Sequence, residues 1–541
     1  MKQQNMLKVI GVSVSLAFAG VSGAAYAAKV PAGVQLAASQ ELVRQNGSEV
    51  ESLDISQIQS TPAISVAEDL YEGLTRRDNS SHILPGVAQS WQQKGSTTWV
   101  FHLRKNARWS NGDPLTADDF VYSWQRTVDP KTATQYGIFF EFLANGKDIM
   151  AGKLPVSALG VKALDKYTLQ ITTTEPTAFL PDMLANPQMG PLHKASFLKY
   201  GKDFTKPGNL VSNGAFTLKE WVVNSRLVLV KNPYYWDAKN VQITKVTFNP
   251  TEDEDASMKM YQSGQIDTLD RIPPGTFAQI KNQQPKELRN NKILGLYYYN
   301  LNNSDPVLKD KRVREALSLV VDREILTQKV LGEGQVAAYG LIVPGTGGAN
   351  VTAYDWSKWP MAKRVAMAKQ LLASAGYGPN HPLSLKLTYN TSELHKKVSL
   401  FLLSEWKNKL GVTGSMENQE FKVFIKTRHD GTYQIARNGW SVDYNDATSF
   451  LDLVRCGSDQ NDLRYCNKNV DALIAQGSKS TDMAKRKELL TQAAKTAMDD
   501  YPMIPLFQYS QPRMAKPYVA GWNVPNPMDL YKTQELYIIK H

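Results

Sequence analysis

The fold of this chain is indicated first by one stretch, Trp109-Ser-Asn-Gly-Asp-Pro-Leu-Thr-Ala-Asp-Asp-Phe-Val-Tyr-Ser-Trp-Gln-Arg126. Within it, Thr116 is followed three residues later by Asp119. This spacing is typical of a capping box, in which two side chains satisfy free N–H groups at the start of a helix. The stretch therefore predicts a helix after Thr116 that carries Phe120 and Trp124.

Apolar residues recur at every second position in two runs near this helix. The runs are Trp99, Phe101 and Leu103, and Tyr167, Leu169 and Ile171. A period of two predicts strands. A third strand is predicted from Arg226 to Lys231, and Asn232-Pro233 ends it.

Helical spacing of apolar residues appears later in the chain. Two segments have it: Val313, Ala316, Leu317 and Val320, then Val398, Phe401, Leu402, Trp406 and Leu410. Another helix is predicted from about Met361 to Ala375, ending at Gly376, because glycine suits the left-handed cap conformation. Strand-like and helix-like segments alternate without an internal repeat. The sequence therefore predicts an α/β protein built from several mixed-sheet lobes.

The first 27 residues have the features of a secretory signal peptide. Lys2 and Lys8 accompany an apolar stretch from Val9 to Val21, and Ala25-Tyr26-Ala27 suits signal peptidase, so we expect cleavage before Ala28. A membrane anchor is the alternative, but it needs about 20 apolar residues. No cysteine lies near the cleavage site for lipid attachment. We therefore expect a soluble periplasmic protein of a Gram-negative bacterium.

Length and charge limit the possible functions. Cleavage leaves 514 of 541 residues, too many for one core and enough for two or three domains. The net charge of +11 falls to +9 without the two signal-peptide lysines. These charges are spread along the chain without basic runs, so nucleic acid is not an expected partner.

Cys456 and Cys466 are the only cysteines, and they flank a polar segment. In an oxidising compartment such a close pair predicts a local disulfide. A metal-binding pair is the alternative, but no histidine lies nearby and the seven in the chain are scattered. We expect neither a metal nor a cofactor.

Three stretches together resemble the signature of the large extracellular solute-binding proteins for peptides and nickel, family 5. They are Gly86-Val-Ala-Gln-Ser-Trp91, Trp99-Val-Phe-His-Leu-Arg104 and the opening stretch to Arg126. The resemblance covers about Val30 to His541. Within the family, the chain is most similar to the oligopeptide-binding type and its murein-tripeptide-binding relative.

The resemblance implies a two-lobed periplasmic-binding-protein fold of type II, cluster C, with an extra inserted domain. The implied boundaries are 28–71, 196–294 and 511–541 for lobe I, 72–195 for the inserted domain, and 295–510 for lobe III. It also implies a monomeric periplasmic receptor that encloses short peptides between its lobes and delivers them to an inner-membrane ABC permease.

Asp443 matches the position at which the family binds the α-ammonium of a peptide. A closed, dry site needs a fixed carboxylate to compensate an ammonium, because an uncompensated buried charge costs several kcal/mol (roughly 3–5). The alternative is that Asp443 caps a helix beginning near Asn445.

Arg437 and His395 match positions that receive the C-terminal carboxylate of short peptides, and Arg428 and His429 are candidates for longer ones. Arginine can bind a carboxylate through two parallel hydrogen bonds. His395 is also consistent with a capping or surface residue at a helix start. Leu331 stands where the family offers a lysine, so peptides of different lengths need not bind equally well.

Strands of both lobes are expected to pair with the ligand backbone, so that affinity does not depend on ligand side chains. The resemblance assigns two segments to this role, Gln59-Ser60-Thr61 in lobe I and Gly439-Trp440-Ser441 in lobe III. Gln59 replaces an acidic residue of the family, which affects the preference for basic side chains. Aromatic residues at the family's roomy, water-filled pockets are Tyr136, Tyr298, Phe421, Trp440 and Tyr509. Each alone could equally be a core residue, and Phe421 replaces a tryptophan.

A secreted hydrolase is the alternative from a different class. The sequence contains no metalloprotease, nucleophile-elbow or phosphate-loop motif, so we expect no enzyme. Within the receptor class, the alternatives to general peptides are murein tripeptide, another amphipathic solute or a metal chelate.

Overall fold

The computed structural model describes Ala28 and residues 30–541, apart from residues 135–136, 459, 481 and 523–524. The predicted signal peptide, residues 1–27, and Tyr136 lie outside the described residues. Among the helices described, none has the length and apolar character that crossing a bilayer requires.

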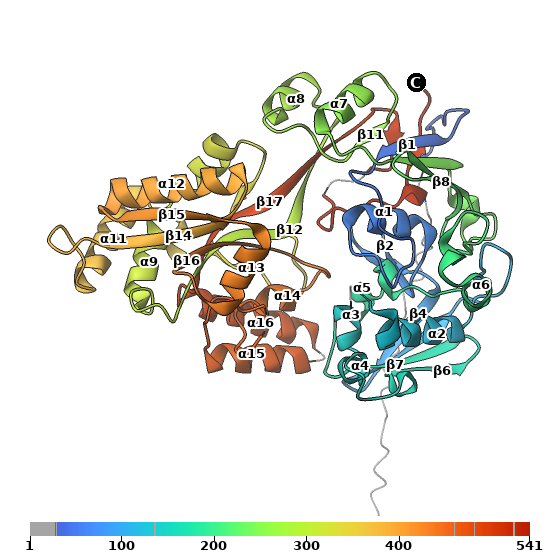
Figure 1. The fold of residues 1–541 in the computed structure, drawn as a ribbon, viewed down its shortest axis with the longest axis horizontal. Helices are drawn as coiled ribbons and strands as arrows, with labels where there is room; N and C mark the ends of the chain where they lie inside the picture. The colour runs from blue at the N-terminus through green and yellow to red at the C-terminus, as the bar shows by residue number, and fades with distance from the viewer. Residues whose placement is uncertain (1–27, 29, 135–136, 459, 481, 523–524) are drawn as a thin grey trace, which may run out of the picture.

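One continuous mixed sheet runs through both lobes (Figure 1). Its strand order is β15-β14-β16-β12-β17-β11-β1-β10-β9-β8, and β13 pairs with β17 off this path. The lobe I strands are β1 (Glu41–Gln45), β8 (Phe216–Val222), β9 (Arg226–Lys231), β10 (Lys245–Asn249) and β11 (Thr268–Leu269). The lobe III strands are β13 (Val336–Ala337), β14 (Ser384–Asn390), β15 (Thr413–Gln419) and β16 (Ile435–Ser441).

Helices surround each end of this sheet. Lobe I carries α1 (Thr61–Leu70), α7 (Glu254–Gln262) and α8 (Phe277–Gln283). The longer helices of lobe III are α9 (Lys311–Leu319), α11 (Met361–Ser374), α12 (Glu393–Leu410), α13 (Phe421–Asp430), α15 (Lys468–Lys479) and α16 (Met483–Met498). Buried apolar residues form a separate core in each lobe, around Phe216 and Phe248 in lobe I and around Trp406 and Phe507 in lobe III.

The inserted domain has its own sheet and core, and it lies below lobe I in Figure 1. Its four strands follow the order β4-β5-β7-β6, and β2 pairs with β3 beside them. The elements are β2 (Thr75–Arg77), β3 (Ile83–Pro85), β4 (Ala88–Lys94), β5 (Thr98–Leu103), β6 (Val161–Asp165), β7 (Thr168–Thr172), α2 (Ala117–Val128), α3 (Ile138–Glu141), α4 (Gly146–Met150) and α5 (Leu180–Met183).

Two long strands, β12 (Leu288–Leu301) and β17 (Met503–Ala515), join the lobes. Their antiparallel register shifts between Lys292 and Leu296. Such irregularities increase the local twist and bend a strand pair. Within this segment a Cβ on Gly295 would lie only 2.9 Å from the ring of Tyr509, so glycine allows the ring to pack there. This segment is the natural hinge between the lobes.

The local sequence predictions are confirmed. The predicted strands correspond to β5, β7 and β9, and the predicted helices to α2, α9, α11 and α12. The Thr116 N–H donates to Asp119 at 2.8 Å in the capping box. Cys456 and Cys466 form a disulfide, so their sulfur atoms are not available as a metal-binding pair.

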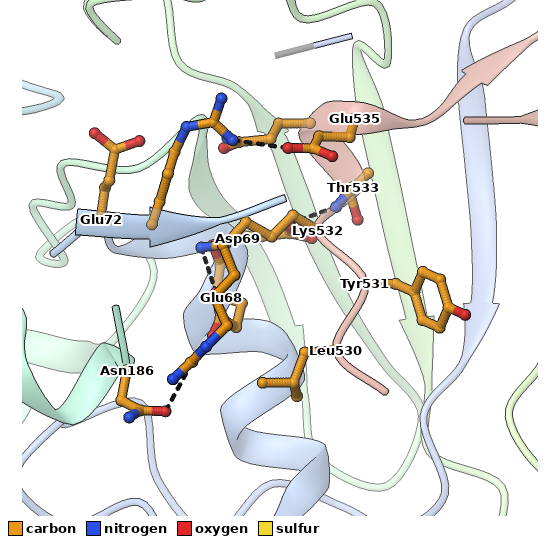
Figure 2. Close-up of polar contacts among 12 residues, drawn as sticks. Glu68, Asp69, Glu72, Asn186, Leu530, Tyr531, Lys532, Thr533 and Glu535 are labelled. Carbon is orange, nitrogen blue, oxygen red and sulfur yellow. Dashed lines mark hydrogen bonds and ion pairs between the residues drawn. The ribbon is translucent and has the colours of Figure 1, made fainter. Parts of the chain in front are cut away.

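A buried cluster of charged residues joins the C-terminal segment to the end of α1, where the chain leaves lobe I for the inserted domain. Arg76 pairs with Glu535 at 2.7 Å. Asp69 accepts the Thr533 N–H at 2.8 Å, and burial raises the pKa of Asp69 to about 6. Figure 2 shows Thr533 and Glu535 on the C-terminal segment, near Asp69 at the end of α1. These contacts hold the segment in which the inserted domain begins against the C-terminal segment.

Candidate functional site

A cleft of about 710 Å³ lies where lobe I, the inserted domain and lobe III meet. Lobe I contributes Thr61 and Pro62, among others, and the inserted domain contributes Asn186 and Gln188. Lobe III contributes Ser441, Val442 and Asp443. Three of the residues predicted to bind ligand, Thr61, Ser441 and Asp443, therefore line one cleft.

The hinge strands form part of the cleft wall through Ile293, Gln511 and Arg513. Arg513 is buried and pairs with two carboxylates, Asp270 at 2.5 Å and Asp529 at 2.6 Å. These pairs satisfy its charge inside the protein. Arg513 therefore fixes the lobe I side of the hinge and offers little free charge to a ligand.

Asp443 follows the end of β16 by two residues and does not cap a helix. The next helix, α14 (Thr448–Leu451), begins five residues later, and its Thr448 N–H donates to Asp446 at 3.0 Å. The helix-cap interpretation of Asp443 is therefore wrong, because Asp446 accepts this N–H instead. Asp443 lines the cleft beside the hinge, where the Val442 N–H donates to the Leu294 carbonyl at 3.0 Å.

Arg437 lies at the other end of β16 among aromatic and amide groups. Its guanidinium donates to the Tyr509 hydroxyl at 3.1 Å and to the Asn390 side chain at 3.5 Å. It also lies over the Tyr297 ring, 4.8 Å from the centroid. The Arg437 Nε has no hydrogen-bond partner. Among the described residues, no carboxylate lies within ion-pair distance (4.0 Å) of this guanidinium.

His395 belongs to the same cluster. It is buried in the first turn of α12, and its Nδ1 lies 3.0 Å from the Tyr297 hydroxyl. Burial, and secondarily the Arg437 charge, lowers the pKa of His395 to about 3. The ring is therefore neutral near pH 7. The residue is neither a surface group nor the N-cap, which is Ser392.

Arg428 and His429 already share a carboxylate. Asp462 is buried and lies 3.6 Å from the Arg428 Nε and 2.8 Å from the His429 Nδ1. Arg428 also donates to the Asn438 side chain. Arg428 and His429 therefore lie together at Asp462, and this carboxylate compensates the Arg428 charge inside the protein.

The side of β16 that faces β14 is only partly paired. On one side β16 pairs with β12 from Ile435 to Ser441. Toward β14, pairing stops at Ala436. The following positions, including the predicted Gly439-Trp440-Ser441, therefore have one free edge. The Gly439 N–H donates at 2.8 Å to the side chain of Asn438, its own neighbour.

The predicted lobe I strand, Gln59-Ser60-Thr61, is not a strand. Thr61 begins α1, and the Ser60 side chain caps that helix by accepting the Ala63 N–H at 3.2 Å. The Glu51 carboxylate accepts the N–H groups of Gln59 and Ser60 at 2.7 and 2.9 Å. Thr61 still lines the cleft, but this segment meets it as a helix start.

The predicted aromatic pocket residues are not equivalent. Tyr298 is 1% exposed and packs in the lobe III core, so its ring does not line the cleft surface. Trp440 is half-buried and donates to the Ser449 hydroxyl at 3.0 Å. Tyr509 contacts Arg437. Phe421 begins α13, and its side chain lies outside the described atoms, as does Tyr136.

Apart from Tyr136, the sequence analysis named no site residue in the inserted domain. Asn186 and Gln188 line the cleft, and Arg77 holds the Asn186 side chain at 3.1 Å. No local motif marks these residues as binding residues. Only the packing of the inserted domain against the segment after β16 brings them to the cleft.

Comparisons with known proteins identify relatives over nearly the whole chain. The sequence model of the bacterial extracellular solute-binding proteins, family 5, matches residues 82–462. The periplasmic oligopeptide-binding protein OppA of Escherichia coli is 44% identical over 536 residues, 97% of this chain and 99% of that protein. The solved structure of Burkholderia pseudomallei OppA is 51% identical, covers 93% of this chain and 100% of that chain, and has a TM-score of 0.75.

The arrangement of the lobes resembles that of an open receptor. The unliganded open form of the murein tripeptide-binding protein MppA is 39% identical, covers 94% of this chain and 99% of that chain, and has a TM-score of 0.88. A second structure of MppA, from Escherichia coli, has the same identity, covers 94% of this chain and 100% of that chain, and has a TM-score of 0.75. At equal identity, the present structure is therefore more similar to the unliganded open form of MppA than to the second MppA structure.

Proposed function

We propose that this chain, which belongs to family 5 of the bacterial extracellular solute-binding proteins, is a periplasmic receptor that encloses short peptides between its lobes and delivers them to an ABC permease. The family consists of solute receptors, not enzymes. The observation that carries the peptide assignment is a strand with one free edge, an arginine near its start and an aspartate two residues beyond its end. That strand is β16.

In this proposal the two ends of a peptide bind at opposite ends of β16. Asp443 compensates the α-ammonium, and Arg437 receives the carboxylate beside the neutral ring of His395. Arg437 supports this role because its described neighbours are hydroxyl, amide and ring groups, so its charge is available. The ligand then runs antiparallel to β16, with its N-terminus beside the hinge.

The length of β16 limits the length of the ligand. Asp443 lies six positions after Arg437, and an extended chain rises about 3.3 Å per residue, so their backbones lie at most about 20 Å apart. Both side chains shorten this span by reaching toward the ligand. Peptides of roughly two to five residues therefore fit, and Arg428 and His429 are the proposed contacts for longer ones.

The backbone of the ligand is proposed to pair with the free edge at Gly439-Trp440-Ser441. Strand addition reads main-chain groups, which every peptide presents. On the lobe I side, Gln59, Ser60 and Thr61 face the ligand through the start of α1. In the first helical turn Pro62 has no N–H and the Ala63 N–H is taken by Ser60, so the Thr61 N–H is the donor proposed for a ligand carbonyl group.

The lobe boundaries given by the family resemblance are part of the proposal. Separate buried cores support residues 72–195 as the inserted domain and 295–510 as lobe III. The register shift in β12 supports a lobe boundary near residue 294.

Calorimetry with a panel of tripeptides and tetrapeptides tests the proposal. Each peptide is offered with free ends, with an N-acetyl group and with a C-terminal amide, and murein tripeptide is included. We expect the free forms to bind with little sequence preference and both modified forms to bind more weakly. Tight binding of murein tripeptide alone would restrict the function to that ligand. No binding by any peptide, with tight binding of a non-peptide solute, would overturn it.

A further inference from the structure

We propose that the inserted domain positions Asp443. The next two residues, Tyr444 and Asn445, contact the inserted domain across the edge of the cleft, and these contacts are called the tie below. This inference rests on the proposed function, because it assigns Tyr444 to the recognition of the ligand ammonium. Tyr444 is a positioning residue in this scheme and does not touch the ligand itself.

The ring of Tyr444 leaves lobe III and packs in the core of the inserted domain. It stacks on Phe179 with centroids 4.3 Å apart and planes inclined by 6°, and it meets the edge of Phe142 at 6.1 Å. Tyr444 is 6% exposed. A buried aromatic ring in two such geometries makes a specific contact as well as an apolar one.

Polar contacts on either side of the ring strengthen this tie. The Asn445 N–H donates to Asp182 at 2.9 Å, and the Asn186 side chain donates to the Asp443 carbonyl at 3.5 Å. One buried arginine, Arg77, holds both partners, donating to Asp182 at 2.8 Å and to Asn186 at 3.1 Å. The inserted domain therefore fixes the backbone immediately before and after Tyr444.

The same segment is also fixed to lobe III. The Gly347 N–H donates to the Asn445 side chain at 2.7 Å, and the Gly347 carbonyl accepts the Ala447 N–H at 2.8 Å. Asp446 makes a bidentate pair with buried Arg486, at 2.7 and 2.9 Å. Residues 443–447 thus bridge the two parts of the molecule beside the hinge.

This bridge explains how a residue outside any helix or strand can bind with a defined geometry. A carboxylate on an unrestrained loop would lose conformational entropy when it pairs with a ligand. Here the backbone on both sides of Asp443 is held by hydrogen bonds. The Val442 N–H donates to the Leu294 carbonyl, and the Asn445 N–H donates to Asp182. We infer that the tie holds the Asp443 carboxylate ready for the ligand ammonium.

The test compares the affinity of the whole protein for a free tripeptide and for its N-acetyl form. In the variant Tyr444→Ala, the ratio of these affinities should fall by about tenfold, the equivalent of a lost aromatic contact. Tyr444→Phe keeps both ring contacts and should keep the ratio. Phe179→Ala removes the ring that stacks on Tyr444 and should lower the ratio in the same way. Because Phe179 is only half-buried, this variant replaces Tyr444→Ala if that variant fails to fold.

A matched control separates positioning from stability. Tyr354 is a buried tyrosine of lobe III that stacks on Trp356 and Tyr501, away from the cleft. Tyr354→Ala should lower the thermal midpoint without changing the ratio. If Tyr444→Ala and Phe179→Ala keep the wild-type ratio while Asp443→Asn lowers it, the tie is overturned and the proposed function stands. If the wild-type protein binds neither peptide form, the proposed function itself fails.

Discussion

Arg437 and Arg428 are both withdrawn from solvent in lobe III, but their surroundings differ. Arg428 has a buried carboxylate partner, Asp462, at 3.6 Å. Arg437 is surrounded by a tyrosine hydroxyl, an amide and an aromatic ring. A charge withdrawn from water without a counterion is costly. The carboxylate of a short peptide is the partner that we propose for Arg437.

Substituting Asp443 with asparagine should weaken the binding of free-amine peptides by about 3–5 kcal/mol, because the ligand ammonium loses its buried countercharge. N-acetylated peptides carry no ammonium, so their weaker binding should change little. Calorimetry with both peptide forms on both proteins measures the coupling as a double-mutant cycle. An unchanged ratio of affinities in Asp443→Asn would exclude the residue from the ammonium site.

The low pKa of His395, about 3, predicts a pH dependence of stability. Histidine in the unfolded chain titrates near pH 6.5. As the pH falls from about 6.5 toward 3, the unfolded state takes up this proton first, so the free energy of unfolding falls. Above about pH 6.5 His395 is neutral in both the folded and the unfolded state, so it does not make the free energy of unfolding depend on pH.

Denaturant unfolding at pH 5 and pH 7 measures this effect. The substitution His395→Gln removes the titrating group, so the variant should lose less stability than the wild type between these pH values. His381 is exposed in a loop outside this buried cluster, and its substitution by glutamine provides the control. Identical slopes for wild type and His395→Gln would contradict the buried neutral ring.

At the scale of elements, local signals in the sequence were sufficient where a helix or strand is determined by its own residues. The Thr116–Asp119 box predicted the start of α2, and the glycine at 376, with a positive φ of 91°, marks the end of α11. The prediction of a strand at Gln59-Ser60-Thr61 was wrong because it followed the family resemblance, although the local sequence indicated a helix start. Ser60 before Thr61-Pro62 is a normal helix start, with a serine cap and a proline in the first turn.

Non-local features could not be predicted in this way. The burial of Tyr298, the pairing of Arg428 with Asp462 and the arrival of Tyr444 in the inserted-domain core depend on contacts between distant segments. The chain also crosses between lobes several times, without a composition change at the crossings. Arg437, His395 and Asp443 came from the family resemblance, because no local pattern marks them as site residues.

The free edge of β16 predicts that the backbone N–H groups of the ligand contribute to its affinity. N-methylation of the central amide of trialanine should weaken binding by roughly 10- to 100-fold. The ligand then loses one N–H donor to β16, and a β16 carbonyl is left without a hydrogen-bond partner. A matched peptide with the extra methyl group on the central side chain keeps its N–H and should bind like trialanine. Equal affinities for all three peptides would exclude strand addition as the binding mode.

The disulfide closes the loop that carries Asp462, the partner of Arg428 and His429. Replacing Cys456 and Cys466 together by alanine should lower the free energy of unfolding by about 3 kcal/mol, because the unfolded chain regains the entropy of an open loop. Urea unfolding of periplasmic material measures the difference. A matched Gln460→Ala substitution in the same loop keeps the disulfide and should leave stability nearly unchanged. Two free thiols in the denatured wild type would contradict the bond.

At the scale of the whole molecule, the continuous sheet means that closure must be accommodated by its two connecting strands. β12 and β17 cross between the lobes, and their register shifts twice in one short segment, between Lys292 and Leu296 and between Tyr297 and Tyr298. The second connection is the Tyr444 segment, which lies beside the same hinge. Two adjacent connections allow rotation about one axis and oppose sliding of the lobes, so a single closing motion is expected.

Small-angle X-ray scattering with and without peptide tests this motion. For a compact chain of this size the radius of gyration is about 24 Å, and closure around a ligand should reduce it by on the order of 1 Å. The ligand-free protein should fit the open structure, because that arrangement matches the unliganded open receptor with a TM-score of 0.88. The N-acetylated peptide at the same concentration is the control and should leave the radius nearer its open value, since it lacks the ammonium that Asp443 compensates. At peptide concentrations that saturate the calorimetric signal, an unchanged radius would show that the peptide binds without bringing lobe III onto lobe I. Binding would then depend on one lobe alone, and the shared cleft would not be the receptor site.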